Sequence, residues 1–179
     1  MKIVASTKLT RAQRAMTESR VYGEAQKKTF DEAETKPLDG EDKKTLLVIC
    51  SSDKGLCGGI HSSLSRTARK MLADNPNKYD VVVIGEKCKA QLGRSNGKDL
   101  KLSFSGIGRN VPTFADAQAI ADQIALLPGD YADTKIMYNR FINAQSYEAT
   151  IIEAFDEEAI KESRTFCLLI HFLSYLSAY

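Results

Sequence analysis

The stretch Thr45-Leu-Leu-Val-Ile-Cys-Ser-Ser-Asp-Lys-Gly-Leu-Cys-Gly-Gly-Ile60 decides how this chain folds. The run Thr45–Cys50 is apolar and has the length and composition typical of a buried strand. Beyond it, apolar residues recur at helical spacing and predict an amphipathic helix over Leu56–Ala73, with an inner face of Ile60, Leu64, Ala68 and Met71. The sequence therefore predicts a strand, a glycine-rich turn and a helix in direct succession.

The same alternation of strand and helix signals continues along the chain. It predicts further strands at Tyr79–Gly85, Leu100–Phe104, Thr134–Phe141 and Tyr147–Phe155. A short helix is expected at Glu86–Leu92. Another should open at Pro112-Thr113, where Thr113 and Asp116 resemble a capping box, and bury Ala117, Ile120, Ala121, Ile124 and Leu127. This alternation predicts the α/β class, with a small parallel or mixed sheet and flanking helices.

The segment from Met1 to about Ala33 has many strong helix formers and no proline. Small and apolar residues recur along it at heptad-like spacing, which predicts a coiled-coil seam of Ala5, Leu9, Ala12 and Met16. A helix of this length would extend roughly 50 Å. We therefore expect a long helix that projects from the α/β domain and needs a partner helix.

Four regions follow from these patterns. We expect a coiled-coil helix over residues 1–34, a linker over 35–44, an α/β domain over 45–155 and an apolar tail over 156–179. The apolar run Phe166–Leu173 in the tail is too short for a membrane span, which needs about 20 apolar residues. No secretory signal is expected, because the N-terminal segment lacks an apolar core.

Composition narrows the class of partner. The chain has 179 residues, 43% hydrophobic and 27% charged, with a net charge of +2, which does not by itself indicate nucleic acid. Its N-terminal helix concentrates basic residues and would suit an acidic partner. The cysteines form no CxxC pair, so we expect reduced and mostly buried thiols, Cys57 included, at Cys50, Cys57, Cys88 and Cys167.

The glycine turn lacks the residues of a phosphate cradle. A Walker-type loop places a lysine and a hydroxyl after its glycines, whereas Ile60 and His61 follow here and Lys54 precedes them. No metal-ligand spacing surrounds His61 or His171, and no serine has a convincing base. We predict no catalytic residue, cofactor or metal, glycines that serve packing, and Asp53 and Lys54 free for surface contacts. The alternatives are a small nucleotide- or phosphate-binding α/β protein using Gly55–Gly59, or an RNA adaptor with a basic helix.

Several short segments carry a resemblance to a known family. They are Met1-Lys-Ile-Val-Ala5 with Lys8-Leu9, Arg20-Val-Tyr-Gly23, Ser51-Ser-Asp-Lys-Gly-Leu-Cys-Gly58, Pro112-Thr-Phe114 and Tyr138-Asn-Arg-Phe141. Together they resemble the gamma subunit of the rotary F-type ATP synthase, of the mitochondrial sort. The resemblance runs from Met1 to about Ala149, and the stretch before Gly58 is its most specific part.

The resemblance implies a non-catalytic central-stalk rotor subunit that couples proton-driven rotation to ATP synthesis on the beta subunits. The implied partners are the alpha and beta subunits, other central-stalk subunits and the membrane c-subunit ring, with no nucleic acid. The implied location is the matrix side of the mitochondrial inner membrane. By resemblance, Lys2, Lys8 and Lys54 face acidic loops of beta. Many relatives have arginine at Lys54, so a bidentate contact would become a point-charge contact here.

The chain also departs from the family pattern at both ends. The resemblance leads us to expect that it lacks the first helical turns, the targeting segment and the long C-terminal helix. Residues Thr165–Tyr179 resemble no part of a gamma subunit, and an incomplete gene model would explain them. A truncated fragment unable to assemble is therefore a further alternative. Without a partner helix, we expect the N-terminal helix to fray.

Overall fold

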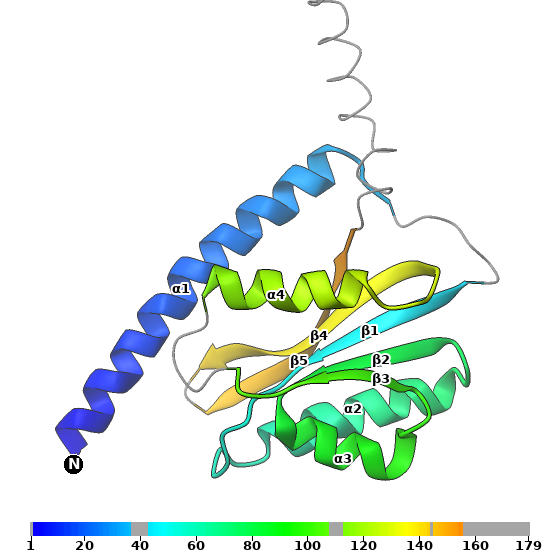
Figure 1. Cartoon of the computed structure of the whole chain (residues 1–179). Coiled ribbons are helices and arrows are strands. Elements are labelled where there is room, and N and C mark those ends of the chain that lie inside the picture. The colour runs from blue at the N-terminus through cyan, green and yellow to red at the C-terminus, as the bar shows by residue number, and fades with distance from the viewer. Residues whose placement is uncertain (1, 37–42, 108–112, 144, 156–179) are drawn as a thin grey trace, which may run out of the picture. The chain divides into compact units, whose positions relative to one another are not determined.

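The computed structural model describes residues 2–36, 43–107, 113–143 and 145–155 (Figure 1). These fall into two compact units, one holding residues 2–36 and the other residues 43–155. The predicted apolar tail and most of the predicted linker lie outside the described residues. Among the described helices, none is both long enough and apolar enough to span a membrane.

The first unit consists of helix α1, Lys2–Glu32, with a short extension. Its Ser and Thr hydroxyls donate to carbonyl oxygens four residues back, as Thr7 does to Ile3 at 3.0 Å. Two ion pairs at helical spacing, Arg14–Glu18 and Lys28–Glu32, add modest local support. The helix expected over Met1–Ala33 is therefore present.

The second unit is built on a five-stranded sheet with the order β3-β2-β1-β4-β5 (Figure 1). Strands β1 to β4 run parallel to their neighbours, and β5 pairs antiparallel with β4, so the sheet is mixed. In chain order the elements are β1 Lys44–Cys50, α2 Ile60–Asp74, β2 Tyr79–Ile84, α3 Glu86–Asn96, β3 Leu100–Phe104, α4 Phe114–Ala125, β4 Tyr131–Asn143 and β5 Ser146–Ala154.

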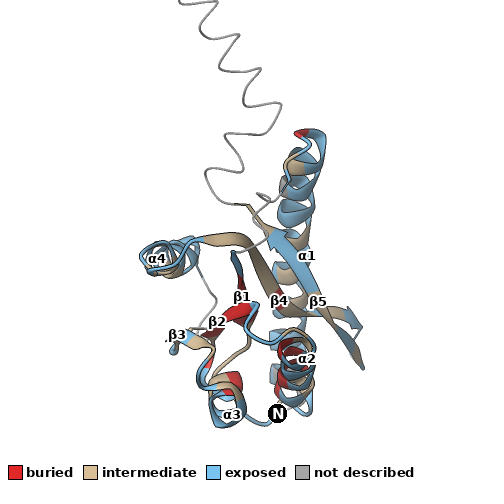
Figure 2. Cartoon of the chain, turned by 90° about the vertical axis from the view of Figure 1, so that its right-hand side faces the viewer, coloured by how far each residue is buried: buried red, intermediate tan, exposed pale blue. Residues whose placement is uncertain are grey.

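The two faces of this sheet are covered unequally (Figure 2). Helices α2 and α3 cover one face with a core of fully or nearly fully buried residues: Leu47, Ile49, Leu64, Ala68, Leu72, Tyr79, Val81, Val83, Cys88, Leu92 and Met137. On the other face only Leu46, Val48 and Val82 are buried in the cluster, and partly exposed residues complete it. The period-two alternation along β1 explains how one apolar run supplies both faces.

Helix α4 confirms its predicted start but not its predicted buried face. Thr113 and Asp116 form the reciprocal capping box, with the Thr113 amide donating to Asp116 at 2.8 Å. No residue of α4 is buried, and Ala117 and Ala121 are exposed. That prediction was wrong because the helix meets this face of the sheet through its C-terminal end, at Ile124 and Leu127, rather than along its length.

Helix α2 begins at Ile60 rather than at the predicted Leu56. Leu56 and Gly58 have φ angles of 58° and 65°, in the left-handed region, which a right-handed helix cannot contain. The apolar spacing was therefore read correctly within the helix, but it extended too far towards the glycines. Leu64 and Ala68 are buried as predicted, whereas Ile60 and Met71 are only half-buried.

Candidate functional site

Three connections meet at the carboxyl edge of the parallel strands β1, β2 and β3. The Ser51 amide and hydroxyl both donate to the Ile84 carbonyl, at 2.8 and 2.9 Å. The Gly85 amide in turn donates to the Phe104 carbonyl at 2.8 Å. Because the carboxyl ends of parallel strands share one edge, the strand pairing itself brings these loops together.

Gly85 permits the closest approach at this edge. Its φ of +106° suits glycine, and a Cβ there would lie 2.5 Å from the Ser51 hydroxyl oxygen and 2.7 Å from the Ser52 amide nitrogen. Any side chain would push the loop after β1 away from the loop after β2. This glycine therefore sets how tightly the two loops pack.

Asp53 joins all three connections through its side chain. Its Oδ1 accepts a hydrogen bond from the Glu86 amide, at the start of α3, at 2.8 Å. Its Oδ2 accepts one from the Gly106 amide, in the turn after β3. The prediction that Asp53 is free for surface contacts was therefore wrong. Both carboxylate oxygens are bonded within the fold.

Residues 54–57 extend beyond this anchor, and we call them the loop tip. The Lys54 carbonyl accepts a hydrogen bond from His61 Nε2 at 3.0 Å, and the Cys57 thiol donates to the Gly55 carbonyl at 3.2 Å. Leu56 has a relative exposure of 108%, so its side chain is entirely in solvent. Cys57 is half-exposed rather than buried as expected, because the tip is a loop and not the first turn of α2.

The loop tip lies among exposed cations. The Lys54 side chain is exposed, and no ion pair joins it to another described residue. The Lys87 ammonium, on α3, lies 3.6 Å from where a Cβ of Gly55 would be. Sequence analysis missed Lys87, which only the fold brings here. It also missed the outward residues of α2, Arg66, Arg69 and Lys70, although their spacing opposite Leu64 and Ala68 was a usable signal.

The far end of the loop is also fixed. The Asn139 amide, on β4, donates to the Ile60 carbonyl at 3.1 Å. Tyr147 of β5 lies close by, with its hydroxyl 3.4 Å from where a Cβ of Gly59 would be. The loop is thus held at both ends and exposed only at its tip.

The titratable groups around the site give no sign of acid–base or metal chemistry in the part of the chain that the structure describes. Burial raises the pKa of the Cys50 thiol to about 11, which keeps it protonated at neutral pH. Within the described ranges, no group of three or more His, Cys, Asp or Glu residues has the arrangement of a metal site. What this edge of the sheet presents to solvent is one apolar side chain among ammonium groups.

The other predicted contact residues lie on α1. Lys8 is exposed, as are Leu9, at 52% relative exposure, and Ala12, while Met16 is half-buried. The side chains of Lys2 and Ala5 lie outside the described part of the structure. Lys8 belongs to the first unit and Lys54 to the second, so the structure does not bring these two cations into one site.

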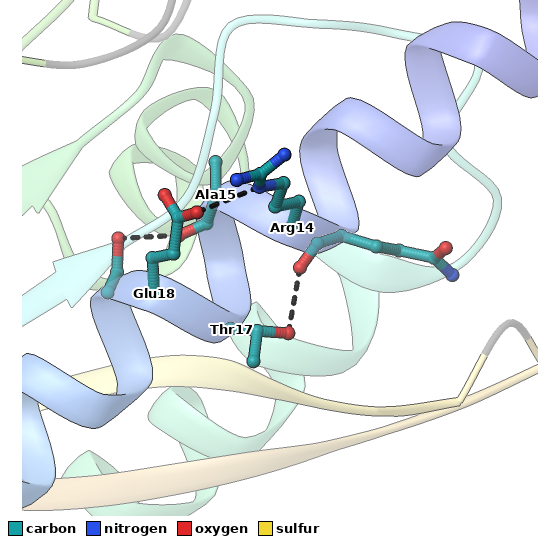
Figure 3. A network of polar contacts seen from close by, with 6 residues as sticks. Arg14, Ala15, Thr17 and Glu18 are labelled. Atoms are coloured by element: carbon teal, nitrogen blue, oxygen red, sulfur yellow. Dashed lines mark hydrogen bonds and ion pairs between the residues drawn. The ribbon is translucent and has the colours of Figure 1, made fainter.

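Much of the polar side-chain capacity of α1 is used within the helix (Figure 3). Arg14 Nε pairs with Glu18 at 3.0 Å, and Thr17 donates to the Gln13 carbonyl at 2.9 Å. Ser19 does the same to Ala15, also at 2.9 Å. Such hydroxyls are satisfied locally, so the groups left for a partner are exposed apolar side chains and unpaired cations such as Lys8.

Comparison with known proteins defines the class of this fold and loop. Residues 1–169 match the family model described as ATP synthase. The chain is 48% identical over 169 residues to the mitochondrial ATP synthase subunit gamma of Yarrowia lipolytica, covering 93% of this chain and 57% of the relative. The chain belongs to the ATP synthase gamma subunit family.

Two further matches agree with this membership. The mitochondrial gamma subunit of Saccharomyces cerevisiae is 40% identical over 173 residues, which cover 93% of this chain and 55% of that protein. Among solved structures, a chain from the central stalk and c-ring of the Tetrahymena thermophila mitochondrial ATP synthase superposes with a TM-score of 0.73 at 32% identity, covering 89% of this chain and 72% of that chain. This chain thus spans little more than half the length of these gamma subunits.

Proposed function

We propose that this chain acts as a central-stalk rotor subunit of a proton-transporting ATP synthase of the mitochondrial type. It would couple proton-driven rotation to ATP synthesis on the beta subunits without carrying a catalytic site itself. The observation that carries this proposal is the loop tip, an exposed apolar and cationic projection held on the family's most specific sequence. Family membership and the likeness to a mitochondrial central stalk support the same role.

The proposed division of labour follows the two units. Residues 1–34 would form the shaft helix and residues 45–155 the foot, joined by a linker at 35–44 and followed by a tail at 156–179. The shaft helix would project and contribute one strand of a coiled coil through Ala5, Leu9, Ala12 and Met16. The exposure of Leu9 and Ala12 supports this assignment, because an apolar seam in solvent calls for a partner helix.

The proposed contact residues are Lys2, Lys8 and Lys54, each facing acidic loops of the beta subunits. The partners would be the alpha and beta subunits, other central-stalk subunits and the membrane c-subunit ring, on the matrix side of the mitochondrial inner membrane. Lys54 has the strongest support, because its ammonium is exposed on an anchored loop and has no ion pair with another described residue.

Leu56 adds an apolar component to the proposed contact. Full burial of a leucine side chain contributes roughly 1.5–3 kcal/mol relative to its exposure. Its left-handed backbone conformation costs about 1–2 kcal/mol, which the fold bears in order to present the side chain to solvent. A partner surface with carboxylates around an apolar pocket would complement both Lys54 and Leu56.

The test is association of this chain with the alpha and beta subunits of the Yarrowia lipolytica enzyme, measured by co-sedimentation or interferometry. Lys54→Glu should weaken association about tenfold, because it replaces an attraction by a like-charge repulsion. The weakening should be smaller at high ionic strength.

The matched control is Lys78→Glu, which makes the same charge change next to the amino end of β2. It should leave association unchanged. Equal weakening by both variants would mean that only net charge matters, and a complete failure of the wild-type chain to associate would contradict the proposed assembly.

A further inference from the structure

We infer that Asp53 is a positioning residue: its carboxylate fixes the loop tip so that Lys54 and Leu56 are presented in one geometry. This inference rests on the proposed function, in which the tip contacts the catalytic head. Asp53 is the last residue before the tip, and its two oxygens bond to backbone amides of two other connections. The tip thereby becomes part of the sheet edge and not a free loop.

The loop would have little rigidity without this anchor. The segment from residue 54 to 59 includes Gly55, Gly58 and Gly59, and glycine has the largest backbone freedom of any residue. Leu56 is held in a conformation that leucine rarely adopts. A strained conformation persists only where the surroundings over-determine it. Here the bonds of Asp53 on one side and of His61 on the other provide that constraint.

The chemistry of the anchor requires a carboxylate. Both bonding partners of Asp53 are amide donors, so both side-chain atoms must be acceptors. An asparagine has the same shape, but one of its two terminal groups is an NH₂ donor, which would face a donor. The amino end of α3 also favours a negative charge next to the Glu86 amide. Asp53→Asn should therefore lose one of the two bonds without changing the volume of the side chain.

Hydrogen exchange on this chain tests the anchor directly. Asp53→Asn should speed exchange at residues 54–57 and at the Glu86 or Gly106 amide by tenfold or more, with exchange in β1 unchanged. The control is Asp122→Asn, which removes the same charge from an exposed position on α4. Equal exchange at the tip in both variants would overturn the inference, as would acceleration in β1 equal to that at the tip.

Association with alpha and beta subunits separates positioning from simple loss of stability. Asp53→Asn should weaken association about tenfold in the wild-type background and have no further effect in a chain that carries Lys54→Ala and Leu56→Ala. An additive effect would overturn the inference, because Asp53 would then act independently of the tip. If removing Lys54 and Leu56 leaves association unchanged, the proposed contact fails, while the exchange experiment still decides whether Asp53 holds the tip.

Discussion

Helix α1 and the sheet unit reach their structures by different routes. The sheet unit encloses a core of its own, with residues such as Leu47, Leu64 and Met137 fully buried between β-strands and helices. Helix α1 has local hydrogen bonds and ion pairs but leaves Leu9 and other apolar side chains exposed. One region is stabilised by tertiary packing and the other mainly by local interactions. Apolar exposure therefore marks where a partner is expected.

The largest expected effect comes from a matched pair of leucine truncations. Leu64→Ala, at a position with no exposure, should lower the free energy of unfolding of the sheet unit by about 2–5 kcal/mol, because it leaves a cavity between α2 and the sheet. Leu9→Ala, on α1, should change it by less than about 0.5 kcal/mol. Urea unfolding followed by circular dichroism measures both.

A large loss of stability on Leu9→Ala would break this comparison, since it would mean that α1 already buries its seam in the isolated chain. Strong protection of the α1 amides near Leu9 in hydrogen exchange would say the same, against the expected fraying of an unpartnered helix.

The next effect concerns the tight edge where the connections meet. Gly85→Ala should destabilise the sheet unit by about 1–3 kcal/mol, because its φ is positive and the new Cβ would clash with the backbone at Ser52. Gly93→Ala, inside α3 with open space around it, should instead stabilise by about 0.5–1 kcal/mol. Thermal unfolding of the two variants tests the opposite signs, and equal destabilisation would contradict the close approach of the loops.

The smallest effect is expected at α4, on the less buried face. Thr113→Ala should weaken the start of this helix by about 1 kcal/mol, because it removes the cap. The control, Thr67→Ala on α2, replaces an exposed mid-helix threonine and should have little effect. Hydrogen exchange of the α4 amides gives the readout, and unchanged exchange would mean that packing alone holds this helix.

The same cap gives α4 a dependence on pH. The hydrogen bonds from the Thr113 amide and hydroxyl lower the pKa of Asp116 below its ordinary value of 3.8. The folded form thus holds its proton less tightly than the unfolded form, so the stabilisation is complete above the ordinary pKa. It is lost as pH falls through the lowered pKa. Acid titration followed by chemical shifts of α4 should show fraying only in that range, and fraying already at neutral pH would contradict the cap.

Local pattern predicted most of the second unit. The apolar run before Ser51, the helical spacing after Ile60 and the capping box at Thr113 each use a periodicity or a hydrogen-bond motif contained in one short segment. The start of α2 and the inner face of α4 were wrong for a common reason. Periodicity shows which residues could share a face, but not where a left-handed turn interrupts the helix or how much of a face meets the sheet.

The sequence by itself determined the α/β class, the long N-terminal helix and the loop that identifies the family, because each depends on residues that are neighbours along the chain. Tertiary structure alone decided the roles of Asp53, Lys87 and Gly85. Asp53 meets Gly106, Lys87 meets Gly55 and Gly85 meets Ser51 only because parallel pairing carries distant loops to one edge of the sheet. No local periodicity records such contacts, since they depend on strand order and on the close approach of backbones.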